Sequence, residues 1–300
     1  MIAAAVAKAA NTGFRELPTT GFIEFPDPDV EFAFWELLPF SVTALCTGLC
    51  GALFCVLVER TTLMRQGFYN RRGLRRRRAY QVVEVVAIAV LTTVLIFWLP
   101  IAMGCRKINN GHMASSGSSE GIWRVGQLPN TVCKDSEYSD LGVLLLLPKE
   151  TAVKALFTHS FEGGASFSIP SLLVTSGVVY VLTIVTHGAA LPGGLFMPNI
   201  LTGACLGRAV GHLMQDWFDA DVQPGVYALI GMVGMLAGFS RMTMSVAMIT
   251  LEITQSTQML IPVVVSILVS KSVADWLKEE SAYEIGVLLH PLGRIYNPKR

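Results

Sequence analysis

The residues best placed to do chemistry in this sequence are Gly193-Gly194-Leu195-Phe196-Met197-Pro198. Pro192 and the two glycines exclude an ordinary helix interior just before Leu195, and an apolar helical pattern runs from there to about Leu213. A helix that begins at a glycine-rich break leaves its first backbone N–H groups without partners inside the helix. These groups lie at the positive end of the helix dipole, where an anion can bind. For the motif alone, a helix start whose glycines serve close packing is the simpler interpretation.

The helix that follows the break carries Gly203, Gly207 and Gly211, one glycine every four residues. Such a stripe lets the backbone of a neighbouring helix come close inside a membrane. Hydrophobic residues make up 52% of the chain and charged residues only 15%, and the mean hydropathy is +0.52. This composition predicts a polytopic membrane domain rather than two soluble domains. The net charge of +1 says little about partners.

A cluster of arginines connects the first two apolar segments. A basic run of this kind can bind nucleic acid. Its place between two apolar segments favours instead a cytoplasmic loop, residues 60–79, that follows the positive-inside rule and contacts anionic lipid. We therefore expect a lipid bilayer and no nucleic acid as partner. The cluster comprises Arg60, Arg65, Arg71, Arg72, Arg75, Arg76, Arg77 and Arg78.

The distribution of apolar residues predicts membrane-spanning helices of about 20 residues each. They cover residues 38–58, 80–104, 168–187 and 259–277. Glu84, near the cytoplasmic end of the second, is interpreted as structural because a charge there can reach the interface.

Between the last two spans lie the apolar segments 225–239 and 243–256, split by Ser240-Arg241. Each is too short to cross a hydrocarbon core of about 30 Å upright. Paired short segments are typical of transporters built from broken helices. A last segment, 281–290, carries Tyr283. The predicted fold is an all-α polytopic membrane protein with short broken helices.

The remaining segments are assigned by their polarity. Residues 1–36 are expected to hold the end of a preceding helix and an acidic luminal loop, and residues 293–300 the start of a cytoplasmic tail. Residues 148–161 predict a short amphipathic helix at the membrane surface. Cys105 and Cys133 flank the polar loop 105–147 on the side opposite the arginines, and we expect a disulfide between them.

Several motifs, in their order along the chain, resemble the CLC family of chloride channels and chloride/proton antiporters. The motif Gly194-Leu195-Phe196-Met197-Pro198 is similar to the family's third chloride-site sequence, Gly-x-Phe-x-Pro. The segment Ser281–Ile285 is similar to the start of the family's last membrane helix. The resemblance runs from about Glu36 to Leu292 and identifies the chain as a member of the family. The motifs are Gly194-Leu195-Phe196-Met197-Pro198, Gly203, Gly207-Arg208, Gly231, Ser240-Arg241-Met242-Thr243 and Leu251-Glu252-Ile253-Thr254.

The resemblance implies a chloride site without a formal cation. Backbone N–H groups at Leu195 and Phe196, next to Gly194, would face the anion, and Tyr283 would donate its hydroxyl. Chloride needs donors that replace its water, yet it must leave quickly, and partial charges meet both demands. The alternative for Tyr283 is an interfacial anchor. Neither a metal nor a cofactor is implied, and no cysteine pair has zinc-finger spacing.

Four ionisable residues in or beside apolar runs have both functional and structural interpretations. Charges inside a membrane are often functional, but Arg208 and Glu252 could equally be satisfied near a helix end or by each other. His187 and His212 are candidate pH sensors, for which an interfacial or hydrogen-bonded structural role is favoured.

The resemblance is to the second of the family's two inverted repeats, residues 37–292, including the final helix. The first repeat should carry Gly-Ser-Gly-Ile-Pro-like and Gly-Arg-Glu-Gly-Pro-like segments, and neither occurs in these 300 residues. The cysteine-bearing loop is most like the intracellular branch, which implies an endosomal, lysosomal or vacuolar membrane.

Two functions follow from this resemblance. The first is chloride transport as half of a channel or antiporter. The second is a non-conducting assembly or regulatory subunit that pairs with full-length CLC proteins, in part through residues 243–277. A homodimer or such a mixed dimer is expected. No enzyme is predicted, because the sequence has no His-Glu-x-x-His pair and no nucleophile constellation.

Overall fold

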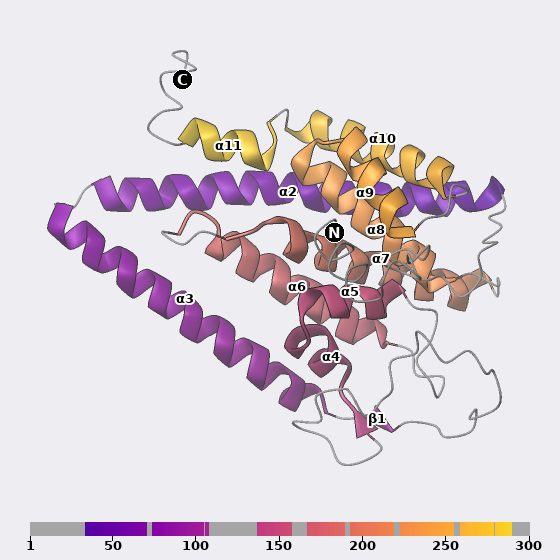
Figure 1. Cartoon of the computed structure of the whole chain (residues 1–300), viewed down its shortest axis with the longest axis horizontal. Helices are drawn as coiled ribbons and strands as arrows, with labels where there is room; N and C mark the ends of the chain where they lie inside the picture. The colour runs from indigo at the N-terminus through magenta and orange to yellow at the C-terminus, as the bar shows by residue number, and fades with distance from the viewer. Residues whose placement is uncertain are drawn as a thin grey trace, which may run out of the picture.

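The computed structural model describes residues 34–70, 74–104, 106–107, 137–157, 167–189, 193–218, 223–254, 259–278 and 280–289. In this part the chain is helical except for one pair of two-residue strands (Figure 1). The all-α prediction is confirmed. The helices are η1 (Phe34–Glu36), α2 (Leu37–Asn70), α3 (Leu74–Met103), α4 (Asp140–Leu146), α5 (Lys149–Phe157), α6 (Ile169–Thr186), α7 (Phe196–Phe218), α8 (Pro224–Ser240), α9 (Met244–Thr254), α10 (Leu260–Leu277) and α11 (Ala282–Leu289).

Among the described residues, four helices are long and apolar enough to cross a membrane, in agreement with the four predicted spans. They cover Leu37–Tyr69, Ala79–Met103, Ile169–Thr186 and Leu260–Leu277. α8 has 17 residues and α9 has 11. At 1.5 Å per residue they reach only about 26 Å and about 17 Å. The two short segments expected from the sequence are therefore short helices.

The first connection differs from the expected loop over residues 60–79. α2 is a single helix of 34 residues that continues to Asn70, and α3 begins again at Leu74. The two helices diverge from this connection as the arms of a V (Figure 1). Arg65 and Tyr69 of this extension have polar partners on α3 and at the end of α6, as described below.

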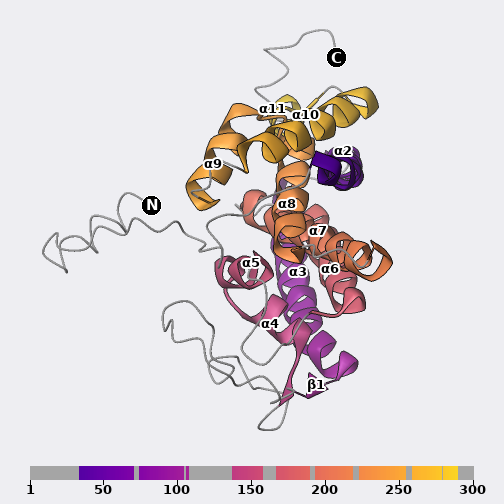
Figure 2. The same cartoon turned by 90° about the vertical axis from the view of Figure 1, so that its right-hand side faces the viewer.

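α8 forms the centre of the molecule. All of its residues are buried, and it packs against α7, α2 and α10. Figure 2 shows α8 with α10 and α2 above it and α7 below. A helix that is apolar on every side is stable only when neighbours cover all of its faces.

Glycines allow α7 and α2 to lie this close to α8. A Cβ on Gly203 would lie 2.6 Å from the main-chain oxygen of Gly231. On the other face, a Cβ on Gly51 of α2 would lie 2.9 Å from the backbone of Gly238. The glycine stripe predicted on α7 is thus a backbone contact with α8.

The segments between α3 and α6 differ from the sequence predictions in two further ways. The strands β1 (Arg106–Lys107) and β2 (Glu137–Tyr138) pair antiparallel, so the expected luminal loop contains regular structure before α4. The predicted surface helix 148–161 corresponds to α5, but it packs inside the fold against α7 and α8, with Leu156 and Phe157 buried. Its apolar face meets protein rather than lipid. Cys105 and Cys133 lie outside the described residues, as do residues 1–33 and 293–300.

Candidate anion-binding site

The sequence-predicted anion motif forms the beginning of α7. The helix begins at Phe196, and the Asn199 N–H donates to the Leu195 carbonyl at 3.4 Å. The N–H groups of Phe196 and Met197 precede this bond and belong to the donors that a helix start leaves unpaired. Pro198 has no N–H to lose and fits the first turn.

A cavity of about 430 Å³ lies against this helix start. Gly193 and Gly194 are exposed, and Leu195 is buried. A Cβ at Gly194 would meet no atom within 4 Å. Glycine is therefore not required for packing at this position, and the close-packing interpretation of the motif does not apply to it. The cavity lining is Ile96, Leu145, Lys149, Val179, Leu182, Thr183, Thr186, His187, Gly188, Gly193, Gly194, Leu195 and Pro198.

The charge of this lining favours an anion. It includes Lys149, and none of the described residues that line the cavity carries a carboxylate. The Lys149 Nζ donates to the Leu145 carbonyl at 3.5 Å, and burial lowers the pKa of this ammonium. Sequence analysis missed Lys149, and the expected site had no formal cation. No local pattern could have indicated it, because only the burial of α5 brings it to the motif.

The segment that leads into the motif is fixed by Arg65 of α2. Its Nη1 donates to the His187 carbonyl at 2.7 Å, and its other amino group donates to the Val185 carbonyl. Its Nε pairs with Glu84 Oε1 of α3 at 2.7 Å, and the Tyr69 hydroxyl donates to the same carboxylate. Arg65 therefore caps the end of α6, where the last carbonyls lack helical partners. Glu84 has the structural role expected of it.

Gly188 makes the turn after α6. Its φ is +78°, and a Cβ there would lie 2.8 Å from Thr62 Oγ1 on α2. The left-handed conformation thus favours glycine, and a larger residue would also displace the Thr62 side chain. Burial lowers the pKa of the neighbouring His187 imidazole, and the Arg65 guanidinium lowers it further.

Tyr283 lies on a different element. The start of α11 is a capping box, in which the Ser281 N–H donates to Glu284 Oε2 at 2.8 Å and the Glu284 N–H donates to Ser281 Oγ at 3.2 Å. The Tyr283 ring is 40% exposed and packs on Phe239 of α8 with ring centroids 5.9 Å apart. Of the four predicted ligands, Gly194, Leu195 and Phe196 are consecutive residues at the start of α7, and within the described residues no hydrogen bond joins Tyr283 to them.

Arg208 and Glu252 are not partners of each other. Arg208 is fully buried, whereas Glu252 is exposed on α9. Arg208 donates to the Ala155 carbonyl at 3.3 Å and to the Leu156 carbonyl, and its guanidinium lies 5.2 Å from the Phe167 ring centre. It caps α5, which is one of the structural roles that the sequence left open.

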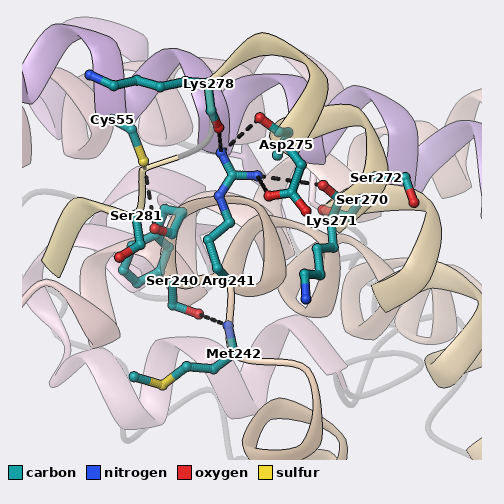
Figure 3. A network of polar contacts seen from close by, with 12 residues as sticks. Cys55, Ser240, Arg241, Met242, Ser270, Lys271, Ser272, Asp275, Lys278 and Ser281 are labelled. Carbon is teal, nitrogen blue, oxygen red and sulfur yellow. Dashed lines mark hydrogen bonds and ion pairs between the residues drawn. The ribbon is translucent and has the colours of Figure 1, made fainter. Parts of the chain in front are cut away.

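A second arginine network occupies the break between α8 and α9 (Figure 3). Arg241 has φ 63° and ends α8, its N–H donating to the Ala237 carbonyl at 3.1 Å. Its guanidinium points toward α10, where it pairs with Asp275 Oδ1 at 3.2 Å. The residue at the break between α8 and α9 is therefore anchored to α10 through its side chain.

Comparison with known proteins decides the family. The profile described as "Voltage gated chloride channel" matches residues 1–275. The chain belongs to this family. The CLC membership implied by the motifs is thereby confirmed, and it rests on most of the chain rather than on one motif.

The relatives include plant, amoebal and animal CLC proteins. The chain is 31% identical to chloride channel protein A of Dictyostelium discoideum, covering 84% of this chain and 32% of that protein. It is 33% identical to chloride channel protein CLC-d of Arabidopsis thaliana, covering 88% and 33%. It is 29% identical to H(+)/Cl(-) exchange transporter 5 of Cavia porcellus, covering 90% and 35%. The chain thus spans about a third of the length of these relatives.

Two solved CLC structures have the same fold. A eukaryotic CLC transporter superposes with a TM-score of 0.58 at 23% identity, covering 87% of this chain and 36% of that one. A cyanobacterial Cl-/H+ antiporter superposes with a TM-score of 0.55 at 17% identity, covering 97% and 54%. The predicted CLC-type fold is confirmed.

Proposed function

We propose that this chain takes part in chloride transport by binding the anion at the start of α7. The observation that carries the proposal is the cavity beside Gly193 and Gly194, whose described lining brings the start of α7 together with Lys149 and includes no acidic residue. The relatives named above are chloride channels and an H(+)/Cl(-) exchange transporter, which makes chloride the anion of choice.

The chemistry of this site suits a transported ion. Backbone N–H groups supply partial charges that replace part of the water around chloride, and Lys149 adds one formal positive charge to the lining. The mainly apolar lining, with Thr183 and Thr186 among the polar exceptions, strengthens these electrostatic interactions because it lowers the local dielectric constant.

Tyr283 is the second part of the proposed site. α11 packs on α2 and α8, and α8 packs on α7, so the tyrosine and the α7 motif flank the same central helix. The hydroxyl is carried on a ring that is 40% exposed, and it can donate to an anion that α7 holds from another direction. Backbone donors and one hydroxyl together would coordinate chloride without a metal or cofactor.

Calorimetric titration of chloride into the purified chain tests this proposal, with gluconate as the control anion. Tyr283→Phe removes only the hydroxyl, so we expect chloride affinity to fall about tenfold, as the loss of one hydrogen bond to a charged group predicts. Chloride binding that equals gluconate binding in the unmodified chain would refute the proposed function. Equal affinity of the two forms would remove Tyr283 from the site.

A non-conducting subunit is the second candidate function. α9 and α10 expose large apolar side chains along residues 243–277, among them Met244 at 80% and Trp276 at 86%. A second CLC subunit, of this chain or of a full-length relative, would cover this surface in a dimer. Co-purification with a full-length CLC protein, combined with no chloride flux in liposomes holding this chain alone, would favour the candidate. Flux from the chain alone would exclude it.

The membrane in which the protein acts is proposed from the intracellular-type loop. Imaging of the fluorescently tagged chain against endosomal, lysosomal and vacuolar markers tests this location. A signal confined to the plasma membrane would contradict it.

A further inference from the structure

The backbone turn after α8 depends on the side chain of Arg241. Among the described residues, Arg241 is the non-glycine residue with positive φ, at 63°. This left-handed conformation is rare for a residue with a Cβ, and it persists where surrounding contacts fix it. The contacts made by the guanidinium are therefore part of what forms the α8–α9 break.

The guanidinium binds the C-terminal turn of α10. Nη2 donates to the carbonyls of Ala274 at 2.7 Å and Lys278 at 2.6 Å, and Nη1 donates to the Lys271 carbonyl at 3.5 Å. The Ala274 carbonyl also accepts from the Lys278 N–H at 3.0 Å, so the guanidinium adds a second donor there. The planar fork of arginine reaches these carbonyls while it also pairs with Asp275, which a lysine ammonium cannot do with the same geometry.

The same turn of α10 leads directly into α11. Lys278, whose carbonyl Arg241 binds, pairs through Nζ with Glu59 of α2 and with Glu280 at 3.8 Å. Ser281 then forms the capping box that begins α11. The position of Tyr283 is thus set by the position of residues 274–281.

α8 also contacts the tyrosine itself. Phe239 packs on the Tyr283 ring, and its carbonyl accepts a hydrogen bond from Cys55 Sγ at 3.5 Å. Phe239 and Arg241 belong to the same turn. The end of α8 therefore contacts the tyrosine ring through Phe239, while the C-cap residue Arg241 contacts the end of α10, as Figure 3 shows.

We infer that Arg241 is a positioning residue for Tyr283. The junction of α10 and α11 is held by its guanidinium, and the tyrosine hydroxyl is thereby aimed at the anion. This role rests on the proposed function of Tyr283, but the holding of α11 is testable without any anion. Arg241 itself does not touch the ion.

Hydrogen exchange of the α11 amides, residues 282–289, measures the holding of the helix. Arg241→Gly keeps the left-handed turn, which glycine adopts without strain, and removes the guanidinium. We expect exchange of these amides to rise at least tenfold, whereas Arg60→Gln, which removes an exposed charge of α2, leaves it unchanged. Arg241→Lys should give an intermediate rate. Unchanged exchange in Arg241→Gly would overturn the inference.

A double-mutant cycle on chloride affinity separates positioning from general stability. Arg241→Gly alone should lower chloride affinity about tenfold. In the Tyr283→Phe background it should cause no further loss, because residues that act through one group are not additive. Additive losses would show that Arg241 acts elsewhere and would overturn the inference. If the unmodified chain binds no chloride, the proposed function fails, and hydrogen exchange still decides the holding of α11.

Discussion

Arg65 of α2 donates to the main-chain oxygen of His187 at 2.7 Å, so a residue of the first long helix holds the segment that leads to the anion motif. The arginine also pairs with Glu84 of α3. One side chain of the arginine cluster thus connects α2, α3 and the end of α6. The site at the start of α7 depends on this connection as well as on its own glycines.

Removal of this connection should destabilise the fold. Arg65→Gln loses the ion pair with Glu84 and two hydrogen bonds to carbonyls at the end of α6. We expect the free energy of unfolding to fall by about 1.5–3 kcal/mol, the range for hydrogen bonds to charged groups. Denaturant titration in detergent measures it, with Arg60→Gln as the control. Equal stability of the two variants would contradict the role assigned to Arg65.

The close contact between α7 and α8 predicts that alanine substitutions at Gly207 and Gly177 change the stability in opposite directions. A Cβ on Gly207 would collide with the Tyr227 carbonyl and lie 2.9 Å from Gly231 Cα, whereas a Cβ on Gly177 of α6 would meet nothing within 4 Å. Gly207→Ala should lower the free energy of unfolding by about 1–3 kcal/mol. Gly177→Ala should raise it by about 0.5–1 kcal/mol, because alanine favours a helix interior. The same unfolding titration distinguishes the two. A neutral Gly207→Ala would refute the close contact.

His187 should make stability depend on pH. It lies just beyond the span Ile169–Thr186, and burial, followed by the Arg65 charge, lowers its pKa. The unfolded chain therefore binds a proton more readily than the folded chain, so stability is fully present above the ordinary histidine pKa of about 6.5 and decreases as the pH falls below it. Melting temperatures between pH 7.5 and about 5 should show this loss. His187→Asn should reduce it, and an identical pH profile in the variant would assign the loss to other groups.

Much of the helical architecture could be predicted from the sequence. Spans such as 168–187 and 259–277 are apolar over the full bilayer thickness, and Ser240-Arg241 interrupts an apolar run at one point. The local sequence pattern is sufficient to predict a helix whose surroundings, lipid or neighbouring helices, are the same along its whole length.

The features that escaped prediction depend on distant contacts. α2 continues to Asn70, and its Arg65 contacts the segment after α6, 122 residues away. α5 is buried by packing on α7 and α8, and Arg208 of α7 donates to its Ala155 carbonyl. This packing brings Lys149 to the cavity lining. The relation between Tyr283 and Arg241 likewise requires α8, α10 and α11 to be placed together, which no periodicity reveals.

Lys149 should contribute charge rather than shape to the cavity. Lys149→Met preserves the length of the side chain and removes the ammonium, so we expect chloride affinity to fall severalfold and its dependence on ionic strength to weaken. Lys149→Arg should retain most of the affinity. Chloride titrations at two ionic strengths compare the three forms. A loss in Lys149→Arg as large as in Lys149→Met would show that the charge is not what matters.

The most direct test of the α7 site removes one backbone N–H. Phe196 is the first residue of α7, a position that proline tolerates. Phe196→Pro deletes the N–H together with the ring, and Phe196→Ala deletes only the ring. We predict that chloride affinity, measured by calorimetry, falls about tenfold more in Phe196→Pro than in Phe196→Ala, as the loss of one charge-assisted hydrogen bond requires. Equal affinities of the two variants would contradict anion binding by the α7 backbone.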